Sequence, residues 1–164
     1  MRDFERLSIE ADAIGLRLEV VRGIPVFEAF PVARHQAVIF RIQSSIRPNV
    51  SGDAPCQCLQ YADVQIRFPD GSRKRPDIAI FCQEPEQTTE ITVSPEAVIE
   101  VISADYKEKD LLISVPFYQQ VRIPDIIVFD PETNEVRHWR NGGNEKTYSS
   151  PVTLDLLCGC TITV

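Results

Sequence analysis

Three short stretches of the chain are apolar almost throughout, at residues 78–82, 97–102 and 126–129. Strands with this pattern are buried on both faces, which happens when helices cover both sides of a sheet. Helical periodicity over residues 107–121 separates the second stretch from the third, and a strand–helix–strand unit favours a parallel crossover. The pattern therefore predicts a mixed α/β fold built on one central sheet.

Further elements are predicted on either side of these strands. The segment MRDFERLSIEADAIG has a weak helical pattern, and Arg22-Gly23 indicates a hairpin turn. Pro116 is expected to bend or restart the helix over 107–121. The remaining predicted elements are strands at 16–21 and 24–29, a helix at 31–46 ended by Pro48, a long strand at 56–68, a strand at 135–139 and one or two strands in 154–164. No internal repeat or long linker interrupts this order, so a single domain spanning residues 1–164 is expected.

Composition limits the class of protein. The 164 residues are 43% hydrophobic and 25% charged, which is typical of a soluble globular domain. No apolar run is long enough to span a membrane, and the charged N-terminal segment does not resemble a secretory signal, so a cytoplasmic location without membrane contact is expected. The net charge of −7 disfavours loose, non-specific binding to nucleic acid. It permits a local site where a divalent metal offsets carboxylates.

The chain has five cysteines, and four of them form two C-x-C pairs, Cys56 with Cys58 and Cys158 with Cys160. On a strand, residues i and i+2 point to the same face, so four thiols could hold zinc if the two segments met. Structural zinc sites, however, normally use wider spacings carried by turns. Small buried side chains in the reduced form are the favoured interpretation, and zinc binding is the alternative.

Three acidic residues lie within or beside the predicted buried strands. Glu100 sits among Val and Ile residues in EAVIEVIS, Asp77 begins the strand in RPDIAIF, and Glu19 lies in the middle of LRLEVVRG. Burying an unpaired carboxylate is costly, and a hard cation such as Mg²⁺ or Mn²⁺, whose ligands are oxygens, would offset that cost. Such a site is suited to phosphodiester hydrolysis, because the metal polarises a phosphoryl oxygen and lowers the pKa of a bound water.

A purely structural interpretation of these acids stays open. Asp77 could cap the turn after Pro76, and Glu100 could pair with a core arginine such as Arg22 or Arg75. The sequence contains no Ser-His-Asp signature, no G-x-x-x-x-G-K-[ST] loop and no G-x-G-x-x-G motif. Triad hydrolases, P-loop proteins and dinucleotide-binding folds are therefore not expected, and no organic cofactor is expected.

An ordered set of motifs covers most of the chain. The motifs are LRLEVVRGIPV, ARHQAVIFRI, RKRPDIAIF, EAVIEVIS and FYQQVRIPDIIVFDPE. Together they resemble the putative restriction endonuclease family abundant in cyanobacteria, within the PD-(D/E)XK nuclease superfamily. The resemblance implies a restriction-endonuclease-like fold, with a central mixed sheet flanked by helices. It also implies a homodimer that hydrolyses DNA with Mg²⁺ or Mn²⁺.

The resemblance assigns roles to four positions. Asp77 matches the acid of the P-D element, and Glu100 matches the acid of the (D/E)-x-K element. Glu19 matches an acid that the family places in its first hairpin. The backbone carbonyl of Val101 corresponds to a further metal ligand of the superfamily. The resemblance thus implies a metal site formed by these four residues, with the three acids taking part in catalysis.

The expected lysine is missing from both places where such a nuclease would carry it. Ile102 occupies the third position of E-x-K, and Ser114 stands where the resembling family has a helix lysine four residues before the tyrosine matched by Tyr118. Lys107 lies two helical turns from Ser114, and Lys109 lies about 140° around the helix from it, so neither replaces the lysine in a regular helix. Both remain candidates if the segment is irregular, and otherwise YKEKD is a solvated helix start.

Two further features have alternative interpretations. The basic cluster Arg73, Lys74 and Arg75 could contact DNA phosphates or form a solvated hairpin end. His35 begins the predicted helix at 31–46 and is interpreted as structural or surface-exposed. The favoured hypothesis is a metal-dependent endodeoxyribonuclease. The alternative is a catalytically degenerate homodimer of the same fold that acts as a DNA- or protein-binding module.

Overall fold

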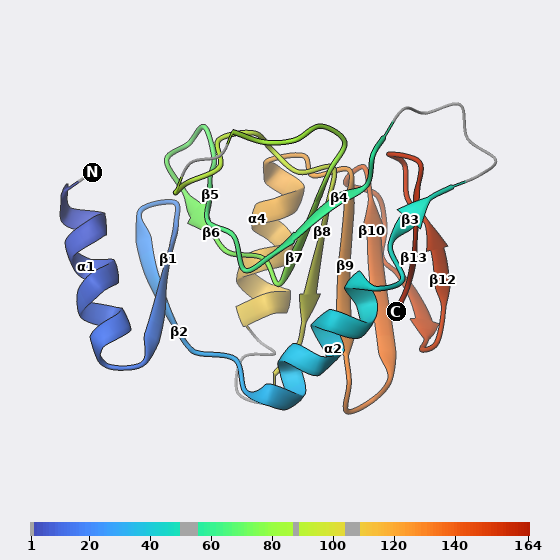
Figure 1. Ribbon diagram of the computed structural model, residues 1–164, viewed down its shortest axis with the longest axis horizontal. Coiled ribbons are helices and arrows are strands. Elements are labelled where there is room, and N and C mark those ends of the chain that lie inside the picture. Colours follow the sequence, from blue (N-terminus) through green and yellow to red (C-terminus); the bar gives the residue numbers. More distant parts are fainter. Residues whose placement is uncertain (1, 50–55, 87–88, 104–108) are drawn as a thin grey trace.

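The computed structural model describes residues 2–49, 56–86, 89–103 and 109–164 (Figure 1). A six-stranded sheet forms its centre, with α2 in front and α4 behind (Figure 1). The sheet order is β11-β10-β9-β8-β7-β4, and these strands cover Lys146–Ser149, Glu135–Arg140, Asp125–Asp130, Ala97–Val101, Ile78–Phe81 and Leu59–Ala62. The helices are α1 (Arg2–Ala13), α2 (Ala33–Gln43), α4 (Val115–Gln120) and the π-helical segment η1 (Asp110–Ser114). The predicted mixed α/β fold is confirmed.

The two faces of the central sheet belong to two apolar clusters. On one face, Ile39 of α2 lies in the same cluster as Ile99 of β8. On the other, Phe117 and Tyr118 of α4 lie in the same cluster as Val98. β8 pairs antiparallel with β7 and parallel with β9, so the predicted parallel crossover is correct. Because successive residues of a strand alternate between faces, the Glu100 side chain shares the α4 face with Val98.

A second sheet lies beside the first and has the order β2-β1-β6-β5. Its strands are β1 (Leu16–Val21), β2 (Ile24–Ala29), β5 (Ile66–Arg67) and β6 (Arg73–Lys74). The predicted hairpin forms as expected, because Arg22 and Gly23 both have positive φ, which suits a two-residue turn between antiparallel strands. Pairing of Val20 with Arg73 brings β6 alongside the second half of β1.

The predicted strand at 56–68 is wrong in its extent. The structure divides it into β4 and β5, which belong to different sheets. Asp63 lies between them with φ of 54°, a left-handed conformation that interrupts an extended strand. The chain therefore leaves the central sheet at this point and joins the N-terminal one.

The predicted helix over 107–121 is confirmed in part. The described portion begins as η1 and continues as α4, with Pro116 in the first turn of α4. Pro116 has no backbone N–H to donate to the preceding turn, and the segment changes from π-helical to α-helical next to it. None of the helices in the described residues is long and apolar enough to cross a membrane.

A small third sheet, β12-β13-β3, lies at the end opposite α1 (Figure 1). It consists of β12 (Thr153–Asp155), β13 (Cys160–Thr163) and β3 (Arg47–Pro48). Disulfides join Cys56 to Cys82 and Cys58 to Cys160, and Cys158 is a free thiol. The interpretation of the cysteines as reduced side chains is therefore wrong for four of the five. It failed because residues far apart in the sequence meet only in the folded chain.

Candidate active site

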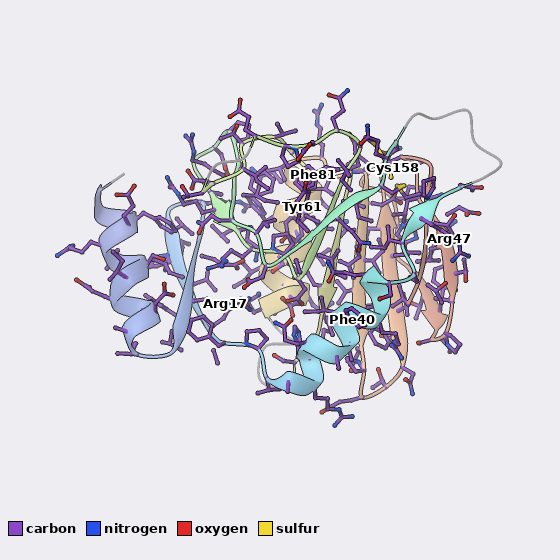
Figure 2. All side chains as sticks on the ribbon, viewed as in Figure 1. Arg17, Phe40, Arg47, Tyr61, Phe81 and Cys158 are labelled. Carbon is purple, nitrogen blue, oxygen red and sulfur yellow. A yellow bond between two sulfur atoms is a disulfide. The ribbon has the colours of Figure 1, made fainter. Side chains whose placement is uncertain are left out.

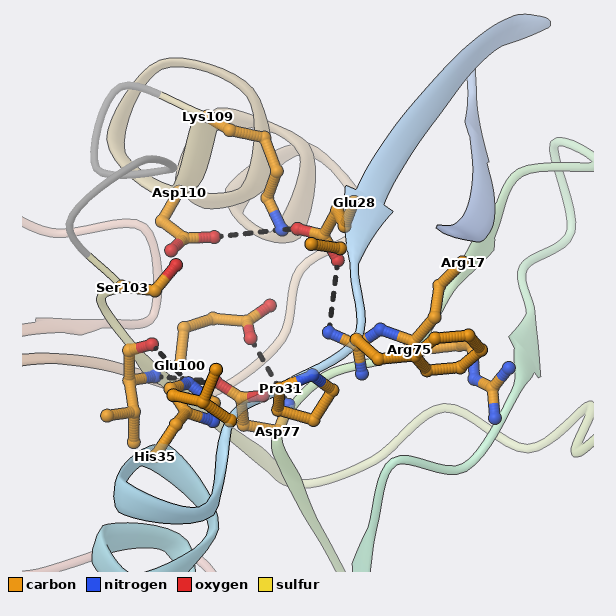
Figure 3. A pocket seen from close by; sticks show the side chains of 14 residues that line it. Arg17, Glu28, Pro31, His35, Arg75, Asp77, Glu100, Ser103, Lys109 and Asp110 are labelled. Carbon is orange, nitrogen blue, oxygen red and sulfur yellow. Dashed lines mark hydrogen bonds and ion pairs between the residues drawn. The ribbon is translucent and has the colours of Figure 1, made fainter. Parts of the chain in front are cut away.

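Asp77 and Glu100 face each other at the ends of neighbouring central strands. Because Ile78 pairs with Ile99 in the antiparallel β7–β8 ladder, Asp77 lies opposite Glu100. The Asp77 N–H donates to Oε2 of Glu100 at 3.2 Å, and the Val101 N–H donates to Oδ2 of Asp77 at 2.8 Å (Figure 3). The sheet itself therefore holds the two carboxylates together.

The Glu100 carboxyl group is almost fully buried. Its Oε1 accepts a hydrogen bond from the Tyr118 hydroxyl at 2.7 Å. Burial raises the pKa of Glu100 to about 8, and the charges of Asp77 and Asp110 act in the same direction, against the opposite effect of nearby lysines. A carboxylate in this position becomes easier to ionise when a cation binds beside it.

His35 contacts the same pair of strands from the first turn of α2. Its Nε2 lies 2.8 Å from the Val101 carbonyl oxygen and 3.3 Å from Oδ2 of Asp77. Burial alone would lower the pKa of His35, but the hydrogen bond and charge of Asp77 outweigh burial and raise it. Its Nδ1 is buried without a hydrogen-bond partner among the described residues. His35 is half-buried rather than surface-exposed, and its ring contacts two atoms of the expected metal site.

Lys74 forms a buried ion pair with Glu19 behind the carboxylates. Its Nζ lies 2.5 Å from Oε2 of Glu19 and donates to Oγ of Ser114 at 3.0 Å. The Arg75 N–H donates to the other carboxylate oxygen of Glu19 at 2.7 Å. Burial alone would raise the pKa of Glu19, but Lys74, Lys109 and this N–H donor outweigh burial and lower it. Glu19 is therefore held as a buried carboxylate.

A cavity of about 230 Å³ opens in front of Asp77 and Glu100 (Figure 3). Lys109 lines it, and its Nζ contacts Glu28, lies 3.0 Å from Oδ1 of Asp110 and lies 3.8 Å from Oε2 of Glu19. Burial alone would lower the pKa of Lys109, but these carboxylates outweigh burial and raise it. Burial raises the pKa of Asp110 to about 6, although Lys109 opposes the shift. The cavity thus presents one ammonium group among several acids.

The opposite wall of the cavity carries two arginines. Arg17 lies 2.6 Å from Oδ1 of Asp63 and 3.4 Å from Oε2 of Glu28. The Nε of Arg75 lies 3.3 Å from Oδ1 of Asp63. Both guanidinium groups line the cavity together with Lys109, so three cationic side chains surround the Asp77–Glu100 pair.

The predicted basic cluster does not form one surface patch. Arg73 is paired with Glu90 at 2.6 Å, Lys74 is fully buried, and Arg75 faces the cavity. The prediction of Lys74 as a surface contact for DNA is therefore wrong, since Glu19 and Ser114 enclose its ammonium group. Arg75 is among the residues that line the cavity.

The other predicted site residues fall into three groups. Asp77, Glu100, Val101 and Lys109 all line the cavity. Glu19 is buried beside Lys74 and is absent from the residues that line the cavity. Lys107 lies outside the described residues.

Sequence reasoning missed Arg17, Glu28 and Asp110. Arg17 lies two residues before Glu19 on the same strand, so the two side chains point to the same face. This spacing could have predicted that Arg17 lies near the site. The pairing of Leu18 with Phe27 places Glu28 opposite Arg17 across the hairpin, which the predicted register also implied. No sequence pattern indicated Asp110, because its position at the cavity depends on the π-helical segment that it begins.

The donor set fits a hard divalent cation. The Asp77 and Glu100 carboxylates and the Val101 carbonyl are oxygen donors, as Mg²⁺ and Mn²⁺ prefer, and they meet at one cavity wall. The buried Glu100 and the unpartnered Nδ1 of His35 are consistent with a site that is completed by a ligand.

Comparison with known structures defines the class of this fold. The crystal structure of a putative nuclease belonging to DUF820, from Anabaena variabilis, is similar with a TM-score of 0.65. Sequence identity is 17%, and the match covers 84% of this chain and 80% of that chain. The mixed α/β fold is thus the fold of a protein described as a nuclease. A search of curated proteins found no match.

The family follows from the sequence itself. The model of the Uma2 family, described as putative restriction endonuclease, matches residues 1–158. The chain belongs to this family, and the resemblance recognised in its motifs is confirmed.

Proposed function

We propose that this protein is a metal-dependent endonuclease that hydrolyses DNA phosphodiester bonds. The observation that carries the proposal is the convergence of Asp77, Glu100 and the Val101 carbonyl on a cavity that also contains Lys109. Oxygen donors for a divalent cation and an ammonium group for a phosphate are the parts that phosphodiester hydrolysis requires. Membership of a family described as restriction endonucleases supports the same reaction.

Asp77, Glu100 and the Val101 carbonyl would hold Mg²⁺ or Mn²⁺. When bound, the cation would polarise a phosphoryl oxygen and lower the pKa of a water. His35 would fix the Val101 carbonyl and Oδ2 of Asp77 relative to one another, because its Nε2 contacts both. Outer contacts of this kind orient the atoms that bind a metal.

The cationic side chains of the cavity would bind the DNA backbone. Lys109 and Arg75 both line the cavity that holds the carboxylate pair, and each would contact a phosphate that enters it. Their charges would also offset the repulsion between the acids and the polyanion, which the net charge of −7 makes necessary. Glu28 and Asp110 hold the Lys109 ammonium group in place.

Lys74 would supply the positive charge that the helix position of Ser114 lacks. Its Nζ lies beside Ser114, although the side chain comes from β6. Because Lys74 is fully buried, it would act by fixing Glu19 and by its charge on Glu100 rather than by touching DNA. Lys109 would be the ammonium group that contacts the phosphate.

A second function is a DNA- or protein-binding module that has lost catalysis. Ser114 favours it, because serine cannot supply the charge of a helix lysine. The contacts of Lys109 with three carboxylates favour it as well, because they leave its ammonium group less available to a phosphate. Such a module would bind DNA or protein without cleaving DNA.

A nicking assay on supercoiled DNA separates the two functions. With Mn²⁺ or Mg²⁺, the wild type should convert supercoiled plasmid to nicked and linear forms, and Asp77→Asn should not. Glu10→Gln, on the exposed surface of α1, is the matched control and should cleave like the wild type. Binding of DNA by the wild type without any metal-dependent cleavage would support the binding module and contradict the nuclease.

The homodimer expected from the resemblance is also a proposal. Cleavage of both strands of a duplex needs two sites, which two copies of the chain would supply. Analytical ultracentrifugation should show a species of twice the chain mass of 18.5 kDa. A monomer that linearises plasmid would contradict this part of the proposal.

A further inference from the structure

All five cysteines of the chain meet at one place in the fold. Cys56 and Cys58 lie just before β4, Cys82 follows β7, Cys158 is in the turn before β13, and Cys160 begins β13. Figure 2 labels Cys158 near the end of β4, where the small third sheet meets the central one. Three separate segments of the sequence therefore bring their sulfur atoms together.

Cys160 is the centre of this sulfur cluster. It is bonded to Cys58, its Sγ lies 3.5 Å from Sγ of Cys56, and the sulfurs of Cys56, Cys158 and Cys160 all lie within 4.8 Å of one another. Cys82 is bonded to Cys56. The three sulfurs nearest Cys160, together with Cys160 itself, are those of the two C-x-C pairs.

We propose that, in the reduced chain, Cys56, Cys58, Cys158 and Cys160 bind one zinc ion. A tetrahedral zinc ion with four thiolates has Zn–S distances of about 2.3 Å, which places neighbouring sulfurs roughly 3.8 Å apart. The separation of Cys56 and Cys160 is already close to this value. Soft sulfur donors select zinc over the hard cations that suit Asp77 and Glu100, so the two sites would hold different metals.

The zinc site requires that both disulfides be reduced. A dithiol reductant donates two electrons and two protons to each disulfide, which gives four thiols and leaves the reductant oxidised to its own disulfide. Zinc binding then releases the protons of the coordinating thiols to solvent. Cys82 is left as a free thiol, because its bond is to Cys56, whereas Cys58 is bonded to Cys160 itself.

The position of the cluster indicates a structural role. Cys160 lies in β13, which pairs with β3, whereas Cys56 and Cys58 adjoin β4 at the edge of the central sheet. A zinc ion here would fasten the small third sheet to the central sheet. The cysteines pack on the face of the central sheet that α2 covers, whereas the Glu100 side chain lies on the opposite face, beside Tyr118 of α4. The zinc proposal therefore does not depend on nuclease activity.

Cobalt spectroscopy tests the proposal on the full-length chain. The protein is reduced with a dithiol under anaerobic conditions, its five thiols are counted, and Co²⁺ is added. The wild type should bind one Co²⁺ with the intense visible absorption of tetrahedral thiolate coordination, and Zn²⁺ should displace it and raise the thermal unfolding midpoint. Asp77→Asn should give the same spectrum, which separates this site from the carboxylates.

Serine variants identify the ligands. Cys160→Ser and Cys158→Ser should each lose the thiolate absorption, whereas Cys82→Ser should keep it. The proposal is overturned if the folded, fully reduced wild type gives no thiolate absorption, or if both disulfides resist the dithiol. It is also overturned if Cys158→Ser, Cys160→Ser and the wild type give the same spectrum.

Discussion

The Nζ atom of Lys74 lies 3.0 Å from the Oγ atom of Ser114, and both side chains are fully buried. Lys74 belongs to β6, and Ser114 ends the π-helical segment. Two elements that are 40 residues apart therefore meet at the position where a helix lysine was expected. The positive charge is present in the structure, but it comes from strand β6 and not from the helix.

This relationship predicts that the charge can be moved between the two elements. Lys74→Met should reduce the free energy of unfolding by about 3–5 kcal/mol, because it removes the nearest positive charge from the buried Glu19 carboxylate. It should also reduce DNA cleavage. The double variant Lys74→Met/Ser114→Lys should recover part of both losses, since its new ammonium group starts beside the same carboxylate. Urea unfolding and plasmid nicking measure the two effects separately.

A double variant no better than Lys74→Met alone would show that position 114 cannot supply this charge. A folded Lys74→Met protein that cleaves at the wild-type rate would show that the charge has no part in catalysis.

Replacing Lys109 should move activity and metal affinity in opposite directions. Lys109→Gln removes a phosphate-binding charge, so the cleavage rate should fall about 10²–10³-fold. The same change removes the ammonium group that contacts Glu28 and Asp110, so the cavity becomes more negative and Mn²⁺ should bind more tightly. Single-turnover cleavage and calorimetric titration measure the two quantities.

Lys146→Gln, on the exposed part of β11, is the control of equal charge and should change neither quantity. If Lys109→Gln cleaves as fast as the wild type, Lys109 is not the phosphate contact.

Asp125 should make the stability of the fold depend on pH. Although burial alone would raise its pKa, hydrogen bonds from His138, the Leu157 N–H and Arg140 outweigh burial and lower the pKa of Asp125 below its ordinary value. A lowered pKa in the folded state stabilises the protein above the unfolded-state pKa. This contribution is lost as the pH falls through the folded-state pKa.

Asp125→Asn should therefore cost on the order of 2 kcal/mol at pH 7 and much less near pH 2. Urea unfolding at several pH values gives this difference. Asp12→Asn, exposed on α1, should stay within about 0.5 kcal/mol of the wild type throughout. An Asp125→Asn penalty that stays constant from pH 7 to pH 2 would contradict the assignment.

The sequence was sufficient to predict the paired acids. Asp77 begins one short apolar stretch and Glu100 lies within another, and such stretches predict strands that are buried on both faces. Their alignment needed only that the two strands be adjacent and antiparallel, which the β7–β8 register bears out. The hairpin around Arg22 and Gly23 was predictable for a similar reason, since local turn chemistry determines it.

The position of Lys74 could not be predicted in the same way. Lysines are almost never fully buried, so a lysine in SRKRP is expected to be solvated. Its burial depends on Glu19 and Ser114, which come from distant parts of the chain. The cysteine cluster was hidden for a similar reason, because sequence spacing within each C-x-C pair says nothing about where the pairs meet. The sequence pattern also predicted one continuous strand at 56–68, which the left-handed backbone of Asp63 interrupts.

The central claim is that Asp77 and Glu100 form one metal site, and calorimetric titration with Mn²⁺ tests it most directly. The wild type should bind Mn²⁺. Asp77→Asn and Glu100→Gln should each weaken binding by more than the roughly 10–100-fold typical of outer contacts, with both proteins still folded. Absence of Mn²⁺ binding to the wild type, or an affinity unchanged by both substitutions, would contradict the claim.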